Sequence, residues 1–215
     1  MWTIVAGMLR WLLLTLIALP AHADDAVGRL NMAGYRQREM CTATLIAPDT
    51  ALTAAHCVTT PEDGYLKRLE NMIFVAAWDG ATHKGSARIA SVEVHPKAYE
   101  NGRFNLRHDI AAVRLSSRLT PPPMTLGRGG LPGPLTLVGY QRSAPHRQVE
   151  TDFCYGDENS GLWRIRCRVE SGQSGGPVLS GDGATRKLVA VIAAVVEEEA
   201  LVVPIDNWVR ALLTD

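Results

Sequence analysis

Short apolar segments separated by turn residues run through most of this 215-residue sequence. Such segments, bounded by Gly, Pro, Asn, Asp or Ser, are typical of strands, whereas amphipathic helices need longer stretches with a period near 3.6 residues. The predicted strands span residues 41–47, 51–55, 72–78, 88–94 and 110–115, and then 135–140, 162–169, 187–196 and 201–205. The sequence therefore predicts an all-β fold.

A proline- and glycine-rich stretch, residues 116–134, divides these strands into two groups. This stretch is predicted to be a linker, because proline lacks the N–H that a central strand needs. Asp206 or Asn207 is placed to cap a terminal helix. The apolar residues of that helix recur at helical spacing: Ile205, Trp208, Val209, Leu212 and Leu213. Two packed β-barrels and a terminal helix account for this order of elements.

The first 23 residues differ from the rest of the chain. Arg10 precedes the apolar run WLLLTLIALP, and an A-x-A site ends at Ala23. These features are typical of a secretory signal peptide. A retained membrane anchor is the alternative, but the run is shorter than the roughly 20 residues that cross a bilayer. We expect cleavage after Ala23, a secreted or periplasmic protein that starts at Asp24, and no stable membrane insertion.

The chain has four cysteines, and in an exported protein an even number indicates disulfides. Three pairings are possible. The most local one joins Cys41 to Cys57 and Cys154 to Cys167, and each loop of about 15 residues would add about 3 kcal/mol of stability. A zinc site is the rival, but no C-x-x-C or H-x-x-x-H spacing supports it. We expect two disulfides and no metal.

Charge and motifs exclude other classes of partner. The 22 basic residues balance 22 acidic ones, whereas nucleic-acid-binding domains carry a basic excess. We therefore expect no nucleic acid, and no motif points to a cofactor. A monomer is expected.

Ser174 lies inside the glycine run ESGQSGGPV. The G-x-S-x-G motif also marks the nucleophile of α/β-hydrolases, whose histidine follows the serine in the chain. Here the last histidine is His146, so chain order excludes that fold. The remaining order is His56 in LTAAHCV, Asp109 in RHDIAAVRL, and Ser174.

These three phrases resemble the chymotrypsin-like (trypsin-like) serine peptidases. The resemblance implies two six-stranded antiparallel β-barrels with a C-terminal helix and the active site between the barrels. After the signal peptide at residues 1–23, we expect the barrels at residues 24–120 and 121–215. Gln173 stands where digestive members have an aspartate that pairs with a freed amino terminus. An uncharged residue is closer to bacterial secreted members such as the glutamyl endopeptidase group, and implies no trypsin-style activation switch.

The resemblance assigns roles that fit the chemistry. His56 acts as base and acid, Asp109 orients its ring, and Ser174 attacks the substrate. The backbone N–H groups of Gly172 and Ser174 form the oxyanion hole. Asp152 or Asp157 could compete with Asp109. His108 is expected to point away from the site. Three further histidines carry no supporting pattern and are expected at the surface: His83, His95 and His146.

Specificity is less defined by the sequence. The resemblance puts Arg168 at the base of the substrate pocket, with Ile192, Ala193 and Val195 in its wall. A buried arginine would disfavour cleavage after Lys or Arg, but strand alternation equally favours an exposed Arg168 paired with Glu170. The expected function is a secreted serine endopeptidase acting on proteins or peptides. The alternatives are an inactive binding protein on the same fold and a secreted esterase.

Overall fold

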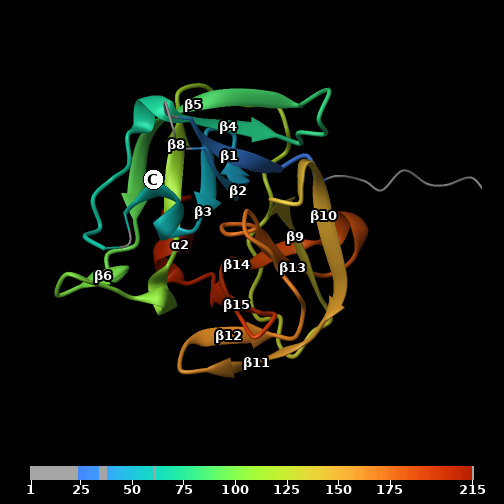
Figure 1. Ribbon diagram of the computed structural model, residues 1–215. Coiled ribbons are helices and arrows are strands. Elements are labelled where there is room, and N and C mark those ends of the chain that lie inside the picture. The colour runs from blue at the N-terminus through green and yellow to red at the C-terminus, as the bar shows by residue number, and fades with distance from the viewer. Residues whose placement is uncertain (1–23, 34–37, 61, 215) are drawn as a thin grey trace, which may run out of the picture.

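The computed structural model describes residues 24–33, 38–60 and 62–214. The predicted signal peptide lies outside these residues. Strands dominate, which confirms the all-β fold, and Figure 1 shows them in two groups, one blue to green and one yellow to red. No helix within these ranges has the length and hydrophobicity needed to cross a membrane.

The first group forms a closed barrel. Its strands are hydrogen-bonded in the order β1-β2-β3-β8-β5-β4, and β4 pairs back onto β1. Gly28 in β1 makes this closure possible, because a Cβ there would lie 2.5 Å from Cζ of the buried Phe74. The strands are β1 (Val27–Ala33), β2 (Arg38–Ala47), β3 (Thr50–Thr53), β4 (Met72–Ala76), β5 (Gly85–Val94) and β8 (Ala111–Leu115).

The second group forms a seven-stranded sheet in the order β10-β9-β13-β14-β15-β12-β11. Its strands are β9 (Leu135–Gln141), β10 (Ala144–Cys154), β11 (Gly156–Asn159), β12 (Leu162–Ile165), β13 (Pro177–Ser180), β14 (Lys187–Val196) and β15 (Glu199–Pro204). Only Tyr155 separates β10 from β11, yet they occupy opposite edges. One bent stretch of chain thus borders both edges, so the sheet curls toward a barrel. It has seven strands, whereas the resemblance predicted a six-stranded barrel.

The connections between these strands carry the remaining short elements. They contain α1 (Ala55–Val58), the 3-10 turns η1 (Leu69–Asn71), η2 (Leu106–His108) and η3 (Gly183–Thr185), and the small hairpin β6 (Tyr99–Glu100) with β7 (Arg103–Phe104). No strand interrupts residues 116–134, as predicted for a linker.

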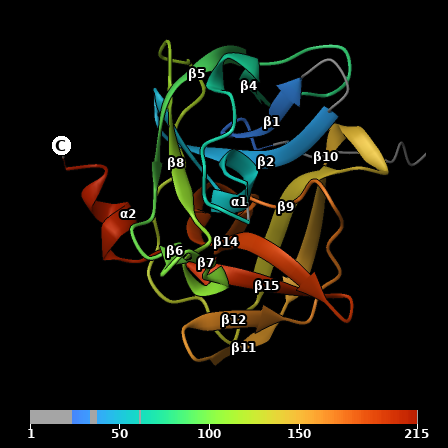
Figure 2. The same ribbon diagram turned by 60° about the vertical axis from the view of Figure 1, so that its left-hand side comes forward.

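The chain ends in α2 (Asn207–Ala211), whose N-cap is Asp206: its side chain accepts a hydrogen bond from Val209 N at 3.1 Å. Val209 and Leu212 belong to a core cluster that contains the buried residues of the first barrel and some of the second sheet, and α2 lies on the side of β8 in Figure 2. The end of the chain therefore returns to the barrel formed by its beginning. The division at residue 120 stays a prediction.

Candidate active site

His56 and Asp109 come from two turns of the first barrel, α1 and the residue that ends η2. Asp109 is fully buried, and its two carboxylate oxygens contact the same residue. Oδ2 lies 2.7 Å from His56 Nδ1, and Oδ1 accepts the His56 backbone N–H at 2.9 Å. Because Nδ1 faces a carboxylate, it carries the ring proton and leaves Nε2 as a hydrogen-bond acceptor.

Ser174 lies on the turn between β12 and β13. Gly172 has a φ of 101°, a conformation that favours glycine. A Cβ at Gly172 would also lie 2.5 Å from Met40 Cε and 2.7 Å from the carbonyl oxygen of Tyr140. The tight turn predicted from the glycine run is therefore present, and only glycine fits its first position.

The backbone N–H groups of Gly172 and Ser174 have no acceptor among the described residues. The carbonyl of Ser171 accepts from Arg142 N at 2.8 Å. Because the N–H and C=O of a trans peptide point in opposite directions, the Gly172 N–H is turned away from that contact. Within the described residues, both N–H groups therefore remain free to donate to a bound molecule.

Thr42 in β2 holds this turn from the other barrel. Its hydroxyl donates to the carbonyl of Gly172 at 2.9 Å, and its backbone N–H donates to the carbonyl of Ser174 at 2.8 Å. The Thr42 hydroxyl also accepts from Tyr140 N at 2.9 Å, and the side chain is fully buried. Sequence reasoning missed Thr42, although it adjoins Cys41 in the predicted strand 41–47.

Gln173 is also fully buried. Its Oε1 accepts from the backbone N–H of Glu170 at 2.8 Å and from Gln141 Nε2 at 3.1 Å. No ionised group takes part in these two contacts. Neutral hydrogen bonds therefore hold the turn that carries Ser174.

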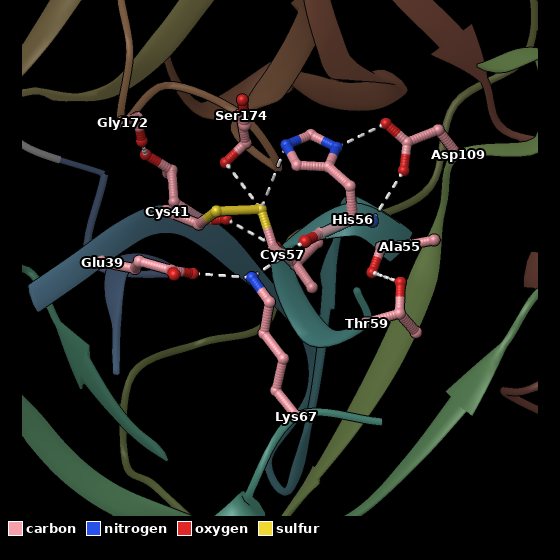
Figure 3. The surroundings of a disulfide bond; sticks show 12 residues. Glu39, Cys41, Ala55, His56, Cys57, Thr59, Lys67, Asp109, Gly172 and Ser174 are labelled. Carbon is pink, nitrogen blue, oxygen red and sulfur yellow. Dashed lines mark hydrogen bonds and ion pairs between the residues drawn. A yellow bond between two sulfur atoms is a disulfide. The ribbon is translucent and has the colours of Figure 1, made fainter. Parts of the chain in front are cut away.

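His56 and Ser174 face one cavity of about 630 Å³, and Figure 3 shows the imidazole ring between Asp109 and Ser174. Cys57 Sγ lies 3.8 Å from both His56 Nε2 and the carbonyl oxygen of Ser174, so one sulfur atom touches both residues. Among the described contacts, no hydrogen bond joins the Ser174 hydroxyl to His56. Such bonds are often long before substrate binds.

All four cysteines are in disulfides, Cys41–Cys57 and Cys154–Cys167, which confirms the local pairing. The first bond connects β2 to α1, directly beneath His56 (Figure 3). Oxidised sulfurs are not thiolate ligands, so the zinc alternative at the cysteines was wrong.

The residues expected to shape specificity lie elsewhere than in this cavity. Arg168 is exposed on the wet face of an alternating segment and makes no ion pair with Glu170 in the described part of the chain. The buried base expected at this position is therefore absent. Ile192 and Ala193 are buried in β14, whereas Val195 is 49% exposed. The backbone of Ile192 pairs with Gly175 and Gly176, beside the nucleophile.

The prediction that His95 lies at the surface was wrong. Its ring is buried, stacks on His108 at 4.5 Å between centroids, and meets Trp208 edge-on at 5.0 Å. Nε2 lies 3.0 Å from Asp206 Oδ2, and Nδ1 accepts from Lys97 N at 3.1 Å. Burial lowers the pKa of His95. His83 and His146 are exposed as predicted, although His146 also lines the cavity.

The competing carboxylates lie away from His56. Asp152 accepts from the Thr136 hydroxyl at 2.5 Å, and Asp157 pairs with Arg166 at 2.6 Å. Asp109 alone of the three contacts the imidazole.

Comparison with known proteins gives the same family as the sequence motifs. The profile of a family described as "Trypsin-like peptidase domain" matches residues 41–191. A search of curated proteins found no match. Among solved structures, the thermostable serine protease AL20 from an extremophilic microorganism is similar, with 18% identity, a TM-score of 0.74, and coverage of 89% of this chain and 99% of that chain.

Two further structures share the fold. A Glu endopeptidase in complex with MPD has 19% identity and a TM-score of 0.74, over 89% of this chain and 89% of that chain. The scabies mite inactivated protease paralogue S-I1 has 15% identity and a TM-score of 0.69, over 88% and 93%. At these identities the likeness shows the fold alone.

Proposed function

The chain belongs to the trypsin-like peptidase domain family, and we propose that it is a serine endopeptidase with a triad of Ser174, His56 and Asp109. One observation carries the assignment. Buried Asp109 binds both the ring and the backbone of His56, and this fixes Nε2 toward the cavity that Ser174 lines.

In the proposed reaction, Ser174 Oγ attacks the carbonyl carbon of the scissile bond while His56 Nε2 accepts the hydroxyl proton. The N–H groups of Gly172 and Ser174 stabilise the oxyanion that develops. His56 then donates the proton to the leaving nitrogen, the C–N bond breaks, and an acyl ester remains on Ser174. A water molecule deprotonated by His56 hydrolyses this ester and restores the hydroxyl.

We also propose that the enzyme works outside the cytoplasm and needs no freed amino terminus. Two disulfides are consistent with an oxidising compartment. Gln173 makes only neutral contacts and itself offers no carboxylate with which a new terminus could pair. Asp24 N, the first described donor, instead contacts Gln148 Oε1 at 3.0 Å.

A serine-directed fluorophosphonate probe tests the proposal. We expect it to label the unchanged protein but not Ser174→Ala. We also expect the unchanged protein, but not Ser174→Ala, to cleave a peptide library derived from a denatured proteome. Labelling without peptide cleavage, but with ester hydrolysis, would replace the peptidase by an esterase.

The second candidate is a non-catalytic binding protein. It is favoured by the absence of a Ser174–His56 hydrogen bond among the described residues and by the likeness to the scabies mite inactivated protease paralogue. Failure of the probe to label a folded, disulfide-bonded protein would support it.

A further inference from the structure

We propose that the cavity beside Ser174 is a carboxylate-binding site, built around Arg29 and Arg142, for the substrate segment that follows the scissile bond. This inference rests on the proposed function, because the catalytic roles of Ser174 and His56 decide which side of the scissile bond occupies the cavity. The binding chemistry depends only on the cavity itself.

The cavity lies on the leaving-group side of the nucleophile. The departing nitrogen must come within reach of His56 Nε2, because that atom protonates it. Cys57 Sγ touches Nε2, and its disulfide partner Cys41 lines the cavity. The cavity therefore opens beside the atom that the leaving amine must approach.

The opposite side of the nucleophile belongs to β14. Ile192 pairs there with Gly175 and Gly176, and none of the residues expected to form the specificity pocket lines the cavity. Instead the wall comes from β1, β2 and the start of β10, with Asn31, Met40 and Pro145 among its members. The cavity is thus a second substrate-binding region.

The side chains that line the cavity carry a net positive charge. Arg29, Lys67 and Arg142 line the cavity together with one carboxylate, Glu39, and Lys67 is already paired with Glu39 at 2.6 Å. Neither Arg29 nor Arg142 has a carboxylate at ion-pair distance among the described residues. Outside those residues the sequence contains only one acidic side chain, Asp215. In a chain with balanced charges, two cations thus line one cavity without a counter-ion from the described residues.

Arg29 is held in place by neutral groups. Its Nη1 donates to the carbonyl of Pro145 at 2.6 Å, and its Nε donates to Asn31 Oδ1 at 3.0 Å. The guanidinium is half-buried, and burial lowers its pKa. A pre-oriented, partly desolvated guanidinium binds a carboxylate more strongly than a mobile surface cation does, since less entropy is lost.

Two sources of carboxylate fit this chemistry. One is an Asp or Glu side chain at the first or second position after the scissile bond. The other is the terminal carboxylate of a substrate that is cut close to its C-terminus. Both would make the same guanidinium contacts. Peptides in which the side-chain and terminal carboxylates are varied independently distinguish the two sources.

The test begins with the peptide library, which reports residues on both sides of each cut. One efficiently cut sequence is then remade with Glu, Gln or Lys at each of the two positions after the bond, and with a free or amidated C-terminus. We expect kcat/KM to be about tenfold higher for Glu than for Gln, the effect of one charge-assisted hydrogen bond. If only amidation lowers the rate, the terminal carboxylate is the ligand.

Arg29→Met and Arg142→Met should each lower kcat/KM for the carboxylate peptides about tenfold and leave the Gln amide peptide unchanged. Arg142 is exposed, so its variant remains informative if Arg29→Met fails to fold. Arg103→Met is the matched control, because Arg103 is exposed on β7 and its side chain makes no hydrogen bond or ion pair among the described residues. Equal rates for Glu, Gln, Lys and amidated peptides would overturn the proposal while leaving the peptidase intact.

A binding measurement decides the question even if no peptide is cut. Fluorescence anisotropy would compare labelled Glu-Ala-Ala, Lys-Ala-Ala and Glu-Ala-Ala amide on Ser174→Ala. Carboxylate-dependent binding that Arg29→Met weakens would support the site in an inactive protein. Equal binding of all three peptides would refute it, whereas loss of hydrolysis alone refutes only the proposed function.

Discussion

Gln173 Oε1 accepts the backbone N–H of Glu170, 2.8 Å away, and so closes the turn that precedes Ser174 with an uncharged bond. Gln173→Met keeps the side-chain length but removes the acceptor. Leaving the Glu170 N–H unpaired costs about 1–3 kcal/mol, so we expect a lower melting temperature. We also expect kcat to fall at least tenfold with little change in KM, because the oxyanion donors depend on this turn. Unchanged kcat in a folded variant would exclude this role.

The neutral anchoring of Gln173 also predicts indifference to the amino terminus. A chain that starts at Asp24 and one extended by Gly-Ser before Asp24 should have the same kcat/KM. The contact of Asp24 N with Gln148 needs only an N–H, which both chains supply. Activity only in the unextended chain would show that a free terminus is required. A chain inert from Asp24 until clipped further would point to a propeptide.

Asp109→Asn is expected to reduce kcat about 10⁴-fold while the fold is preserved. An amide reverses the preferred tautomer of His56, so that Nε2 no longer accepts a proton. Asp152→Asn is the matched control, because Asp152 contacts Thr136 rather than the imidazole. Steady-state kinetics of the two variants would identify the orienting carboxylate. Equal effects would disprove the assignment.

The two disulfides should differ in their effect on activity. Each removal, Cys41→Ala with Cys57→Ala or Cys154→Ala with Cys167→Ala, should cost about 3 kcal/mol of stability. Only the first pair touches His56 and Ser174, so only its loss should lower kcat at a temperature where both variants are folded. A comparable fall in kcat for the second pair would contradict this reading of the site.

Acid should destabilise the protein through His95. Burial lowers the pKa of His95 in the folded state, although Asp206 opposes this and His108 and Lys97 add to it. The unfolded chain therefore binds the proton more readily. Stability is fully present above the ordinary pKa of about 6.5 and is lost as pH falls from there through the folded pKa.

Urea unfolding between pH 5 and pH 7.5 measures this effect. We expect His95→Gln to have a smaller loss of stability across the range, and His83→Gln, at an exposed site, to behave like the unchanged protein. A pH dependence that is identical in all three proteins would show that another group is responsible.

The sequence predicted the parts of the fold that apolar patterning controls. Residues 187–196 coincide with β14. The disulfides were also predicted, and the helix cap, predicted at Asp206 or Asn207, is Asp206. β10 was missed because half of its length faces solvent and carries polar residues without strict alternation. β13 was missed because it begins at Pro177, directly after the glycine run.

The site was predicted only as far as its motifs extend. Local phrases identify His56, Asp109 and Ser174, but Thr42 acts through contacts 130 residues away in the chain, which no local pattern encodes. Arg29 was missed for the same reason, since Pro145 and Arg29 meet only in the folded chain. His95 was misplaced because its burial depends on Trp208 and Asp206, at the far end of the sequence.

The order of strands along the chain separates the reacting groups in time. The six strands of the first barrel all end by Leu115, so the segments that carry the imidazole and its carboxylate are synthesised before Ser174, although α2 joins the barrel core later. The turn that carries Ser174 is complete only after Ile192 is synthesised, because backbone hydrogen bonds between Ile192 and both Gly175 and Gly176 hold that turn against β14. On the proposed mechanism, a nascent chain without Ser174 has the base but no nucleophile, so it cannot hydrolyse the ribosomal proteins around it.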